Sequence, residues 1–338
     1  MHDFSYARPR EVAAALHLAQ QPGARFIAGG TNLLDLMKGG VEEPSRLIDI
    51  SRIADLARIG DAPSGGLRIG ALATNADTAA HPAVRERYPL LAQAILAGAS
   101  PQLRNMASAG GNLLQRTRCP FFYDTGFHEC NKRDPGSGCA ALGGFNRNHA
   151  ILGASEACIA VNPSDMSVAL AALDAIVQIR SLRGSRAVPV SEFHRLPGQT
   201  PQHDTVLAAG EMIVAVDLPP NELARHSYYL KIRDRASYAF ALVSVAAALD
   251  LDDAEGGAVK DVRLVIGGVA HKPWRVAEVR DLLVGKRVDP QSLAAIADAA
   301  ASGAKPYKYN AFKVGLMKRA IVRALTEAAA QAADRRVA

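Results

Sequence analysis

The chain has 338 residues, enough for two or three domains of ordinary size and for a sizeable hydrophobic core. Hydrophobic residues make up 49% of it and charged residues 21%, which excludes wholesale disorder and a fibrous repeat. The longest nearly uninterrupted apolar stretch, residues 238–249, is well short of the roughly 20 residues that span a bilayer. We therefore expect no membrane insertion.

The net charge is modest. Lys and Arg number 39 against 33 Asp and Glu, which gives +6, and aromatic residues are only 5% of the chain. Because the basic residues are dispersed, this is a weak footprint for nucleic acid. We expect a solvated basic surface or a patch for an acidic partner protein, and no nucleic-acid binding. The N-terminus lacks a basic region followed by an apolar one, so no secretory signal is expected.

The first third of the chain alternates short strands with helices. Residues 10–20 carry an amphipathic helix pattern, and residues 24–28 read as a buried strand followed by a turn at 29–32 and an apolar exit at 33–37. Further strands are predicted at 47–50 and 67–71, and a helix at 88–99. The class is therefore mixed α and β.

Periodicity fails between residues 115 and 156. This stretch is rich in Gly, Asn, Asp, Pro and Arg, and it holds three of the four cysteines. Loops of this length without structure of their own are uncommon in compact domains unless function or a cross-link orders them. We therefore expect a functional role or a cross-link to order this segment.

Regular structure returns after residue 162. Ser164 or Asp165 is placed to cap a helix at 166–174, and strands follow at 175–181 and within 210–219. A linker near residue 222 divides a first domain, 1–222, from a second, 223–338. In the second we predict strands at 228–233 and 262–266, an apolar segment at 239–249 that is ambiguous between strand and helix, and helices at 273–285, 290–302 and from 311. The last helix carries Phe312, Leu316 and Ala320 on one stripe.

Two glycine turns are near copies of each other. The runs 29–34 (Gly-Gly-Thr-Asn-Leu-Leu) and 110–114 (Gly-Gly-Asn-Leu-Leu) each follow an apolar or small-residue segment. Paired glycines let backbone amides approach a phosphate closely. Neither run has the spacing of a Rossmann or P-loop motif. Two tight hairpin turns are the alternative.

The four cysteines, Cys119, Cys130, Cys139 and Cys158, cluster in one short part of the chain. Without a secretory signal a soft metal centre is favoured over disulfides. The absence of a Cys-x-x-Cys pair argues against a zinc ribbon, and four thiolates suit a [4Fe–4S] cluster. Nearby basic residues would offset the thiolate charge: Arg116, Arg118, Lys132, Arg133 and Arg147. A structural zinc site, which His128 and His149 could complete, or two disulfides remain the alternatives.

No nucleophile and base stand out in the sequence. There is no G-x-S-x-G or H-E-x-x-H motif, and no carboxylate pair is singled out by spacing. We therefore predict no catalytic side chain, and we expect any chemistry to lie in bound cofactors.

Taken together, these residues resemble the FAD-binding subunits of molybdenum hydroxylases, the xanthine dehydrogenase and aldehyde oxidoreductase family. The resemblance lies in five runs that follow the family's order over nearly the whole chain: 26–34 (Phe-Ile-Ala-Gly-Gly-Thr-Asn-Leu-Leu), 104–113 (Arg-Asn-Met-Ala-Ser-Ala-Gly-Gly-Asn-Leu), 163–165 (Pro-Ser-Asp), 237–241 (Ser-Tyr-Ala-Phe-Ala) and 267–270 (Gly-Gly-Val-Ala). The fold implied is α+β: a two-lobed FAD-binding domain of the vanillyl-alcohol oxidase (PCMH) type, then a small C-terminal α+β domain as in CO dehydrogenase flavoproteins.

The cysteine segment narrows the resemblance. The runs 116–120 (Arg-Thr-Arg-Cys-Pro), 130–133 (Cys-Asn-Lys-Arg), 135–139 (Pro-Gly-Ser-Gly-Cys) and 155–158 (Ser-Glu-Ala-Cys) are similar to the flavin subunit of periplasmic aldehyde oxidoreductase. That subunit carries a [4Fe–4S] cluster on such an insert, which relatives that reduce NAD generally lack. The resemblance implies an insert at about 115–158 whose four cysteines ligate the cluster.

Residue by residue, the resemblance implies a flavin site. The first glycine run would wrap the FAD pyrophosphate and ribityl chain with Phe26, Ile27, Ala28, Gly29, Gly30, Thr31, Asn32, Leu33 and Leu34. Ser108, Gly111 and Asn112 would complete the second set of phosphate and ribityl contacts, and Ser108 stands where the family more often has threonine. Asp165 is similar to the family's acidic contact to the flavin, and Lys231 to a lysine close to the isoalloxazine ring.

The function this implies is electron output from a heteromeric aldehyde oxidoreductase. A large molybdenum-cofactor subunit would oxidise an aldehyde, a small [2Fe–2S] subunit would relay electrons, and FAD on this chain would deliver them to an external acceptor. Export to the periplasm with a partner subunit is the expected location, and the cytoplasm is the alternative. A self-sufficient FAD-dependent oxidoreductase and a metal-stapled scaffold without flavin are the rival functions.

Overall fold

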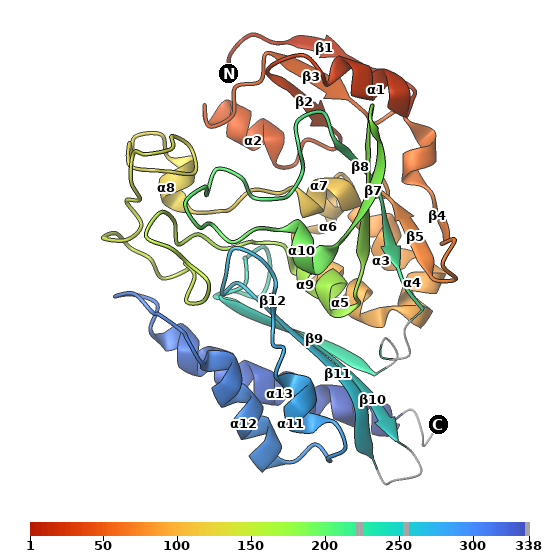
Figure 1. The fold of residues 1–338 in the computed structure, drawn as a ribbon, viewed down its shortest axis with the longest axis vertical. Helices are drawn as coiled ribbons and strands as arrows, with labels where there is room; N and C mark the ends of the chain where they lie inside the picture. Colours follow the sequence, from red (N-terminus) through yellow and green to blue (C-terminus); the bar gives the residue numbers. More distant parts are fainter. Residues whose placement is uncertain (221–222, 224–225, 253–256, 335–338) are drawn as a thin grey trace.

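A computed structural model describes residues 1–220, 223, 226–252 and 257–334, with the side chains of 331–334 excluded. Figure 1 shows two sheet-bearing lobes from the N-terminal part of the chain above a smaller C-terminal lobe. The predicted domain boundary at residue 222 lies outside the described residues. In the described part of the chain, no helix combines the length and apolar character that a bilayer span requires.

The first lobe contains a three-stranded parallel sheet. Its strand order is β1 (Ser5–Ala7), β3 (Arg46–Asp49) and β2 (Ala24–Ile27), and it is accompanied by α1 (Val12–Leu18), α2 (Leu33–Lys38) and the 3₁₀ turn η1 (Ala54–Ala57). The strands predicted at 24–28 and 47–50 are confirmed. The apolar exit after the first glycine turn is the helix α2, which buries Leu36 and Met37.

The second lobe is built on a five-stranded antiparallel sheet. Its order is β4 (Ile59–Asp61), β5 (Leu67–Gly70), β8 (Met212–Leu218), β6 (Ile176–Ser181) and β7 (Gly184–Pro189). The strand predicted within 210–219 is β8, which pairs with both β5 and β6 at the centre of the sheet. Segments far apart in sequence therefore share one sheet, and residues 71–175 lie between its strands β5 and β6 in the sequence.

Short helices lie beside this sheet, except for α8, which belongs to the cysteine-bearing insert. They are α3 (Asn75–Ala80), α4 (Pro82–Arg87), α5 (Pro89–Ala97), α6 (Pro101–Arg104), α7 (Ala109–Leu113), α8 (Pro120–Tyr123), α9 (Asp165–Ala172) and α10 (Val190–Phe193). The predicted cap of α9 is Ser164, whose hydroxyl accepts a hydrogen bond from the Ser167 amide at 2.9 Å. Every residue of α9 is buried, so this helix is a central element of the core.

The C-terminal lobe is a four-stranded antiparallel sheet covered by helices on one face (Figure 1). Its order is β12 (Trp274–Arg275), β11 (Ala258–Gly267), β10 (Val243–Asp252) and β9 (Ser227–Ile232), and its helices are α11 (Val279–Leu283), α12 (Pro290–Ala301) and α13 (Phe312–Asp334). The predicted helix at 273–285 is thus partly strand, and only its second half is helical.

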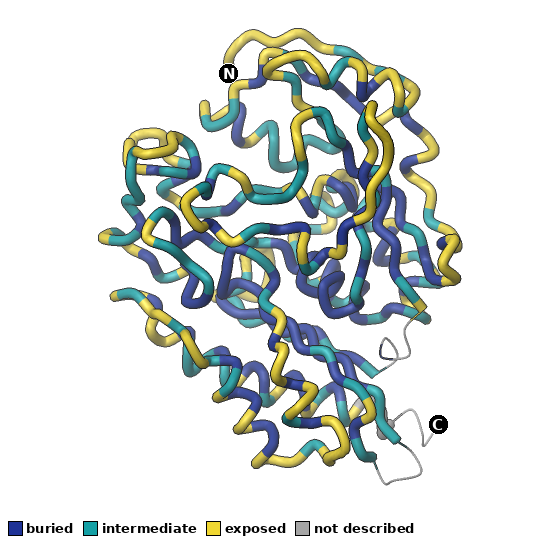
Figure 2. The backbone as a smooth tube through the Cα atoms, in the orientation of Figure 1, coloured by how far each residue is buried: buried dark blue, intermediate teal, exposed yellow. Residues whose placement is uncertain are grey.

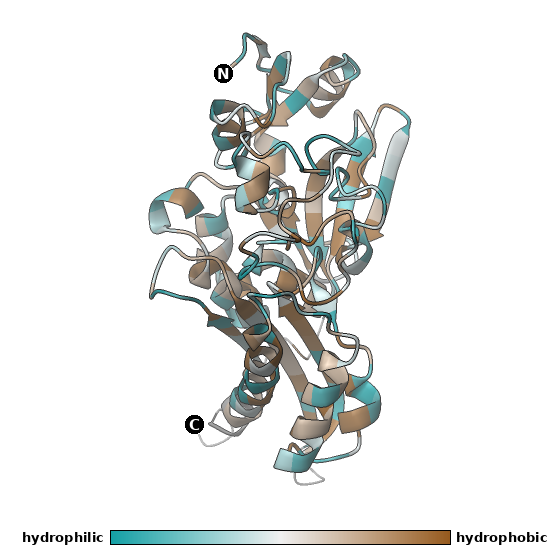
Figure 3. Cartoon of the chain, turned by 90° about the vertical axis from the view of Figure 1, so that its left-hand side faces the viewer, coloured by the Kyte–Doolittle hydropathy of each residue, from teal (hydrophilic) through white to brown (hydrophobic). Residues whose placement is uncertain are grey.

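The ambiguous segment 239–249 is mainly the strand β10, which is buried on both faces. Val245 and Ala247 belong to the cluster under α12 and α13, whereas Ala246 and Ala248 belong to the core that contains α5 and α9. Figures 2 and 3 show this sheet as buried and hydrophobic over most of its length. A strand covered on both sides loses the apolar and polar alternation that would identify it from sequence.

The stripe predicted on the last helix is wrong in register. Ala320 is buried, but Leu316 is only partly buried and Phe312 is 37% exposed. The buried face instead runs through Lys313, Met317 and Ile321. In the first turn of α13, Phe312 faces outward beside Arg147, whereas Lys313 is the buried residue.

Residues 114–164 contain little regular structure, as predicted. Their only helix is α8, and two isolated bridges join Cys130 to Cys139 and Ser155 to Cys158. In Figure 1 this insert, coloured yellow to green, lies at the left edge between the upper lobes and the start of α13.

Candidate flavin and thiol sites

The first glycine turn lines a cavity of about 280 Å³ between the two upper lobes. Of the residues predicted to bind the dinucleotide, residues 26–33 line this cavity together with Ser108 and Gly111. Leu34 does not line it and instead lies against Gly30, where an added Cβ would be 2.7 Å from the Leu34 side chain. The structure therefore brings two turns that are 80 residues apart in sequence to one cavity.

Glycine is required at both positions of the first turn for different reasons. A Cβ on Gly29 would stand 1.8 Å from the carbonyl oxygen of Met106, so the backbones of the two turns approach too closely for a side chain. Gly30 adopts φ +70°, a conformation that side chains disfavour. In the described structure the amides of residues 29–32 donate no hydrogen bond. Consecutive amides without partners at a glycine turn form an anion site.

The second turn is built differently, although its sequence is nearly the same. Ser108 caps α7, because its hydroxyl accepts a hydrogen bond from the Gly111 amide at 3.2 Å. The Gly110 amide donates to the Ala71 carbonyl and the Asn112 amide to the Ser108 carbonyl. These amides already have hydrogen-bond partners. The second turn therefore lets another group approach its backbone closely, but it offers no free amide donor. Neither turn joins two strands, so both lie outside the hairpin alternative.

A second cavity of about 360 Å³ adjoins the first and shares Thr31, Asn32 and Gly111 with it. Asn112, Asp165 and Lys231 line this second cavity. These three residues were all predicted to contact the flavin, and they therefore meet beside the first glycine turn. The two adjoining cavities together extend from the first glycine turn to the start of α9.

Asp165 and Lys231 form a buried ion pair in the second cavity. Lys231 Nζ lies 2.7 Å from Asp165 Oδ2, and the two side chains are only 4% and 8% exposed. Tyr229 donates its hydroxyl proton to Asp165 Oδ1 at 2.7 Å, and Lys231 also donates to the Ala97 carbonyl at 3.1 Å. Burial beside this carboxylate raises the pKa of Tyr229 well above its ordinary value. The lysine thus carries a fixed, compensated charge.

Two further donors face the second cavity without a partner among the described residues. Asn112 accepts hydrogen bonds at Oδ1 from Gln115 and Ser164, which leaves its Nδ2 without a described acceptor. The buried Nε of Arg118 likewise has no acceptor. Of these two donors only Arg118 Nε is buried, and a buried donor is rarely left without an acceptor. Together with the anion site, they fit a ligand that has a diphosphate at one end and a ring with carbonyl groups at the other, as FAD does.

Sequence reasoning missed the wall formed by Arg118, Tyr123 and Phe240. The Arg118 guanidinium lies 5.4 Å from the Tyr123 ring centroid and 5.3 Å from that of Phe240, which is 49% exposed. Arg118 and Phe240 line the second cavity. The aromatic residue Phe240 in run 237–241 was the one sign of this wall in the sequence. Its partners Arg118 and Tyr123 come from a distant loop, and no local sequence pattern predicts that they meet it.

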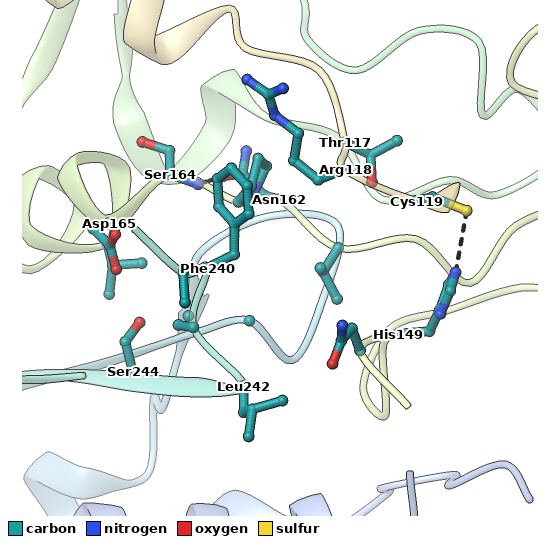
Figure 4. A pocket seen from close by; sticks show the side chains of 18 of the residues that line it. Thr117, Arg118, Cys119, His149, Asn162, Ser164, Asp165, Phe240, Leu242 and Ser244 are labelled. Atoms are coloured by element: carbon teal, nitrogen blue, oxygen red, sulfur yellow. Dashed lines mark hydrogen bonds between the residues drawn. The ribbon is translucent and has the colours of Figure 1, made fainter. Parts of the chain in front are cut away.

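A third cavity, of about 340 Å³, lies between the flavin residues and the cysteines. Figure 4 shows Ser164 and Asp165 on one side of it and Cys119 with His149 on the other. Cys119 Sγ is 3.1 Å from His149 Nε2. Arg118 and Phe240 line both this cavity and the flavin cavity, so they separate the two spaces by a single layer of side chains.

All four cysteines line one small cavity in the insert, and no disulfide joins them. Burial raises the pKa of the Cys119 thiol to about 12. The hydrogen bond between Cys139 and Cys158 lowers the pKa of Cys139 and raises that of Cys158. Among the described residues, no three His, Cys, Asp or Glu side chains approach closely enough to form a metal-binding group. The thiols share a space without forming a metal centre in this arrangement.

The basic residues of the insert are mostly engaged by other partners. Lys132 Nζ, 2% exposed, lies 2.5 Å from Asp204 Oδ1, and Arg116 Nε lies 2.8 Å from Asp204 Oδ2. Arg116 also pairs with Glu42, and its backbone amide donates to Asn32 Oδ1 at 2.9 Å. These two cations lower the pKa of Asp204 against the effect of its burial. The network ties the thiol loop to the first glycine turn.

The two histidines considered for a mixed zinc site differ in environment. His128 is exposed, whereas His149 is only 3% exposed, and burial lowers the pKa of His149 to about 4. His149 is therefore a neutral ring at pH 7 that contacts Cys119 through Nε2. Of the pair, only His149 lies beside the thiols.

Comparison with known proteins agrees with this geometry. Residues 2–221 match the FAD binding domain in molybdopterin dehydrogenase, and residues 228–331 match the CO dehydrogenase flavoprotein C-terminal domain. The chain is 52% identical to the aldehyde oxidoreductase FAD-binding subunit PaoB of Escherichia coli, over 98% of this chain and 100% of that one. It is 27% identical to the glyceraldehyde dehydrogenase medium chain of Sulfolobus acidocaldarius, over 90% of this chain and 89% of that one.

Solved structures share the whole fold. Quinoline 2-oxidoreductase from Pseudomonas putida 86 matches with a TM-score of 0.74 and 26% identity, over 97% of both chains. Carbon monoxide dehydrogenase from Hydrogenophaga pseudoflava matches with a TM-score of 0.75 and 25% identity, over 98% of both chains. The α+β fold with its C-terminal flavoprotein domain is thereby confirmed. The chain belongs to the FAD-binding subunits of the molybdenum hydroxylases, and it is an oxidoreductase subunit of the aldehyde and xanthine dehydrogenase family.

Proposed function

We propose that this chain is the electron-output subunit of a molybdenum-dependent aldehyde oxidoreductase. It would receive electrons from a [2Fe–2S] subunit, which takes them from the molybdenum subunit, and pass them to an external acceptor. The observation that carries the proposal is that the first glycine turn lines one cavity and that Asn112 and the Asp165–Lys231 pair line the cavity adjoining it. The 52% identity to an aldehyde oxidoreductase subunit supports the substrate class.

The side chains of this site would bind and position FAD. The free amides of residues 29–32 would hold the pyrophosphate, and Asn112 Nδ2 and Arg118 Nε would donate to acceptors on the ribityl chain or the ring. FAD, when bound, supplies a two-electron redox group that no amino-acid side chain offers. Lys231 is held by Asp165 and Ala97, so its charge is oriented before the ligand arrives.

The direct test compares the isolated chain with the assembled complex. Anaerobic addition of an aromatic or aliphatic aldehyde should bleach the flavin absorbance near 450 nm only when the molybdenum and [2Fe–2S] subunits are present. An artificial one-electron reductant should bleach it in both samples, which controls for a damaged flavin. Aldehyde-dependent bleaching by the isolated chain would contradict the proposal and favour a self-sufficient oxidoreductase.

We propose in addition that Cys119, Cys130, Cys139 and Cys158 ligate a [4Fe–4S] cluster. The four thiols are unpaired by disulfides and line one cavity in an insert with little regular structure. A bound cluster would order such a loop, because ligand binding and folding of the loop are then one process. The third cavity would separate this cluster from the flavin.

Metal analysis of anaerobically purified protein tests the cluster. We expect about four irons and four acid-labile sulfides per chain, lost in Cys139→Ser. Gly143→Ser is the matched control, because Gly143 lies in the same loop and an added Cβ there meets nothing within 4 Å. One zinc per chain without iron, or iron retained in Cys139→Ser, would contradict the assignment.

Periplasmic location by export with a partner subunit is also a proposal, supported by the resemblance to periplasmic aldehyde oxidoreductase. Cell fractionation tests it. We expect the chain in the periplasmic fraction when its partner subunits are expressed with it, and in the cytoplasm when it is expressed alone. Cytoplasmic location in both cases would contradict the proposal.

A further inference from the structure

Tyr229 is a buried tyrosine of β9 that reaches the flavin site only through another residue. It is 7% exposed, and it is not among the described residues that line the first or the second cavity. Its hydroxyl donates to Asp165 Oδ1 at 2.7 Å. A buried hydroxyl needs a partner, and this one is paired with the acidic residue of a ligand cavity.

The strand β9 presents two donors to the same carboxylate. Residues two apart in a strand share one face, so Tyr229 and Lys231 both point toward the start of α9, where Asp165 is the first residue. Tyr229 donates to Oδ1, whereas Lys231 Nζ lies 2.7 Å from Oδ2. Each oxygen of the carboxylate therefore has its own donor from β9.

The position of Tyr229 is fixed by the protein alone. Its backbone amide donates to Gln93 Oε1 at 2.8 Å, which ties this edge strand to α5, and its ring belongs to the core cluster that contains α5 and α9. Burial and the charge of Asp165 raise the pKa of the hydroxyl well above its ordinary value, and a hydrogen bond with Ser244 offsets this only in part. Tyr229 therefore keeps its proton and donates to Asp165 before any ligand binds.

Lys231 has one donor that the described structure does not use. A lysine amine carries three N–H donors. Two of them go to Asp165 Oδ2 and to the Ala97 carbonyl, and the third has no partner among the described residues. Because Lys231 lines the second cavity, this donor and its charge are available to a ligand there.

We propose that Tyr229 is a positioning residue for the flavin: it occupies one oxygen of Asp165, so that Lys231 keeps its third donor for the isoalloxazine ring. This inference rests on the proposed function, because it takes the presence of FAD from it. Lys231 is the other side chain that donates to this carboxylate in the described structure. Without the hydroxyl, Oδ1 would be a buried acceptor without a partner, and the carboxylate would turn to take the third donor of Lys231.

The consequence concerns both binding and redox chemistry. A cation that donates toward the ring stabilises the negative charge that the ring gains on reduction. Loss of this donor to Asp165 should therefore weaken FAD binding and lower the reduction potential of the bound flavin. A tyrosine that merely fills the core would change neither quantity when its hydroxyl is removed.

Tyr229→Phe removes only the hydroxyl and tests the proposal in the full chain loaded with FAD. At the solution potential that reduces half of the wild-type flavin, we expect the ratio of reduced to oxidised flavin to fall roughly tenfold, or about 30 mV for a two-electron couple. The dissociation constant for FAD should rise by roughly fivefold or more, since a hydrogen bond to a charged group is lost. An unchanged ratio, or a higher one, would overturn the proposal.

Tyr88→Phe is the matched control, because it also removes a buried tyrosine hydroxyl. Tyr88 is 1% exposed, donates to the Pro219 carbonyl at 3.0 Å, and is not among the described residues that line the first or the second cavity. Urea unfolding of the flavin-free chain should show a loss of stability in both variants. Only Tyr229→Phe should change the potential and the FAD affinity. Equal changes in both variants would overturn the proposal.

A ligand without the ring separates positioning from damage to the whole site. Adenosine diphosphate has the diphosphate but no isoalloxazine, so its affinity, measured by competition with FAD, should agree within about twofold between Tyr229→Phe and the wild type. Weakening of adenosine diphosphate by the same factor as FAD would overturn the proposal. Failure of the wild-type chain to bind FAD would instead contradict the proposed function.

Discussion

The buried pair of Asp165 and Lys231 fixes the electrostatics of the flavin site at the level of single residues. Lys231→Met removes the cation and leaves the Asp165 carboxylate buried with Tyr229 as its main partner. Breaking a buried pair from one side costs about 3 kcal/mol of unfolding free energy. Urea unfolding of the flavin-free chain at pH 7 should show this loss, and Asp165→Asn added to Lys231→Met should recover part of it. Purely additive losses would contradict the coupling.

Two further buried imidazoles predict how stability depends on pH. Burial lowers the pKa of His194 to about 4, and burial with Lys132 nearby lowers that of His271 to about 3. In the unfolded chain both titrate near 6.5, so the unfolded state binds more protons below that pH. The stabilisation is complete above pH 6.5 and is lost as the pH falls toward 4. At pH 5 each neutral imidazole accounts for about 2 kcal/mol of that loss.

His271→Leu isolates this effect. Neither ring nitrogen of His271 has a hydrogen-bond partner among the described residues, so leucine removes the titration without breaking a hydrogen bond. Chemical unfolding at pH 7 and pH 5 should show a smaller acid-induced loss in the variant than in the wild type. Equal losses would mean that His271 is already protonated, or accessible, in the folded protein.

At the scale of elements, the start of α13 anchors the insert. Lys313 is fully buried, and its amine donates to the His149 carbonyl at 2.9 Å and to the Gly268 carbonyl. Lys313→Met would leave the Gly268 carbonyl without its described donor and the His149 carbonyl with Asn310 alone, at a cost of about 1–3 kcal/mol for the unpaired carbonyl. We expect trypsin to cut after Arg147 several-fold faster in this variant. Lys318→Met, which removes a surface ion pair with Asp298, should not change the rate.

Most elements could be predicted from the sequence because their patterns are local. The strands at 24–28, 47–50 and 228–233 and the cap of α9 by Ser164 follow from residue type and spacing alone. The strand β10 could not be assigned, because it is covered on both faces and shows no alternation. The register of α13 was predicted wrongly because a charged residue, Lys313, is the buried one in its first turn, where it meets the carbonyls of His149 and Gly268 from distant parts of the chain.

The candidate site, like the fold, could be predicted from the sequence only in part. The sequence identified both glycine turns, but their near identity hid a difference in hydrogen bonding that only the packing of α7 against residues 71–73 produces. Arg118 and Phe240 meet across 122 residues of sequence, so no local signal links them. The four cysteines were placed in one loop correctly, whereas the engagement of Lys132 and Arg116 by Asp204 was not foreseen.

At the scale of the whole molecule, residues of all three lobes line the adjoining cavities. The two upper lobes form the first cavity, and β9 of the C-terminal lobe brings Lys231 to the second. The insert places Cys119 on the far side of the third cavity from Asp165 (Figure 4). The chain thus places the cavity of the four thiols, the third cavity and the two cavities of the glycine turns next to one another.

The central claim is that FAD occupies the joined cavities at the two glycine turns, and Gly111 tests it most directly. A Cβ at Gly111 would meet only the Ser108 hydroxyl, at 3.0 Å, so valine there asks for a small shift of that side chain, and Gly111 lines both cavities. Gly60→Val, on an exposed edge strand where nothing lies within 4 Å, is the control.

A titration with FAD, followed by quenching of flavin fluorescence, should give one FAD per chain for the wild type and for Gly60→Val. Gly111→Val should bind at least roughly 100-fold more weakly, about 2.7 kcal/mol, while its thermal unfolding midpoint stays within a few degrees of the wild type. Tight, stoichiometric FAD binding by Gly111→Val, or none by the wild type, would contradict the account.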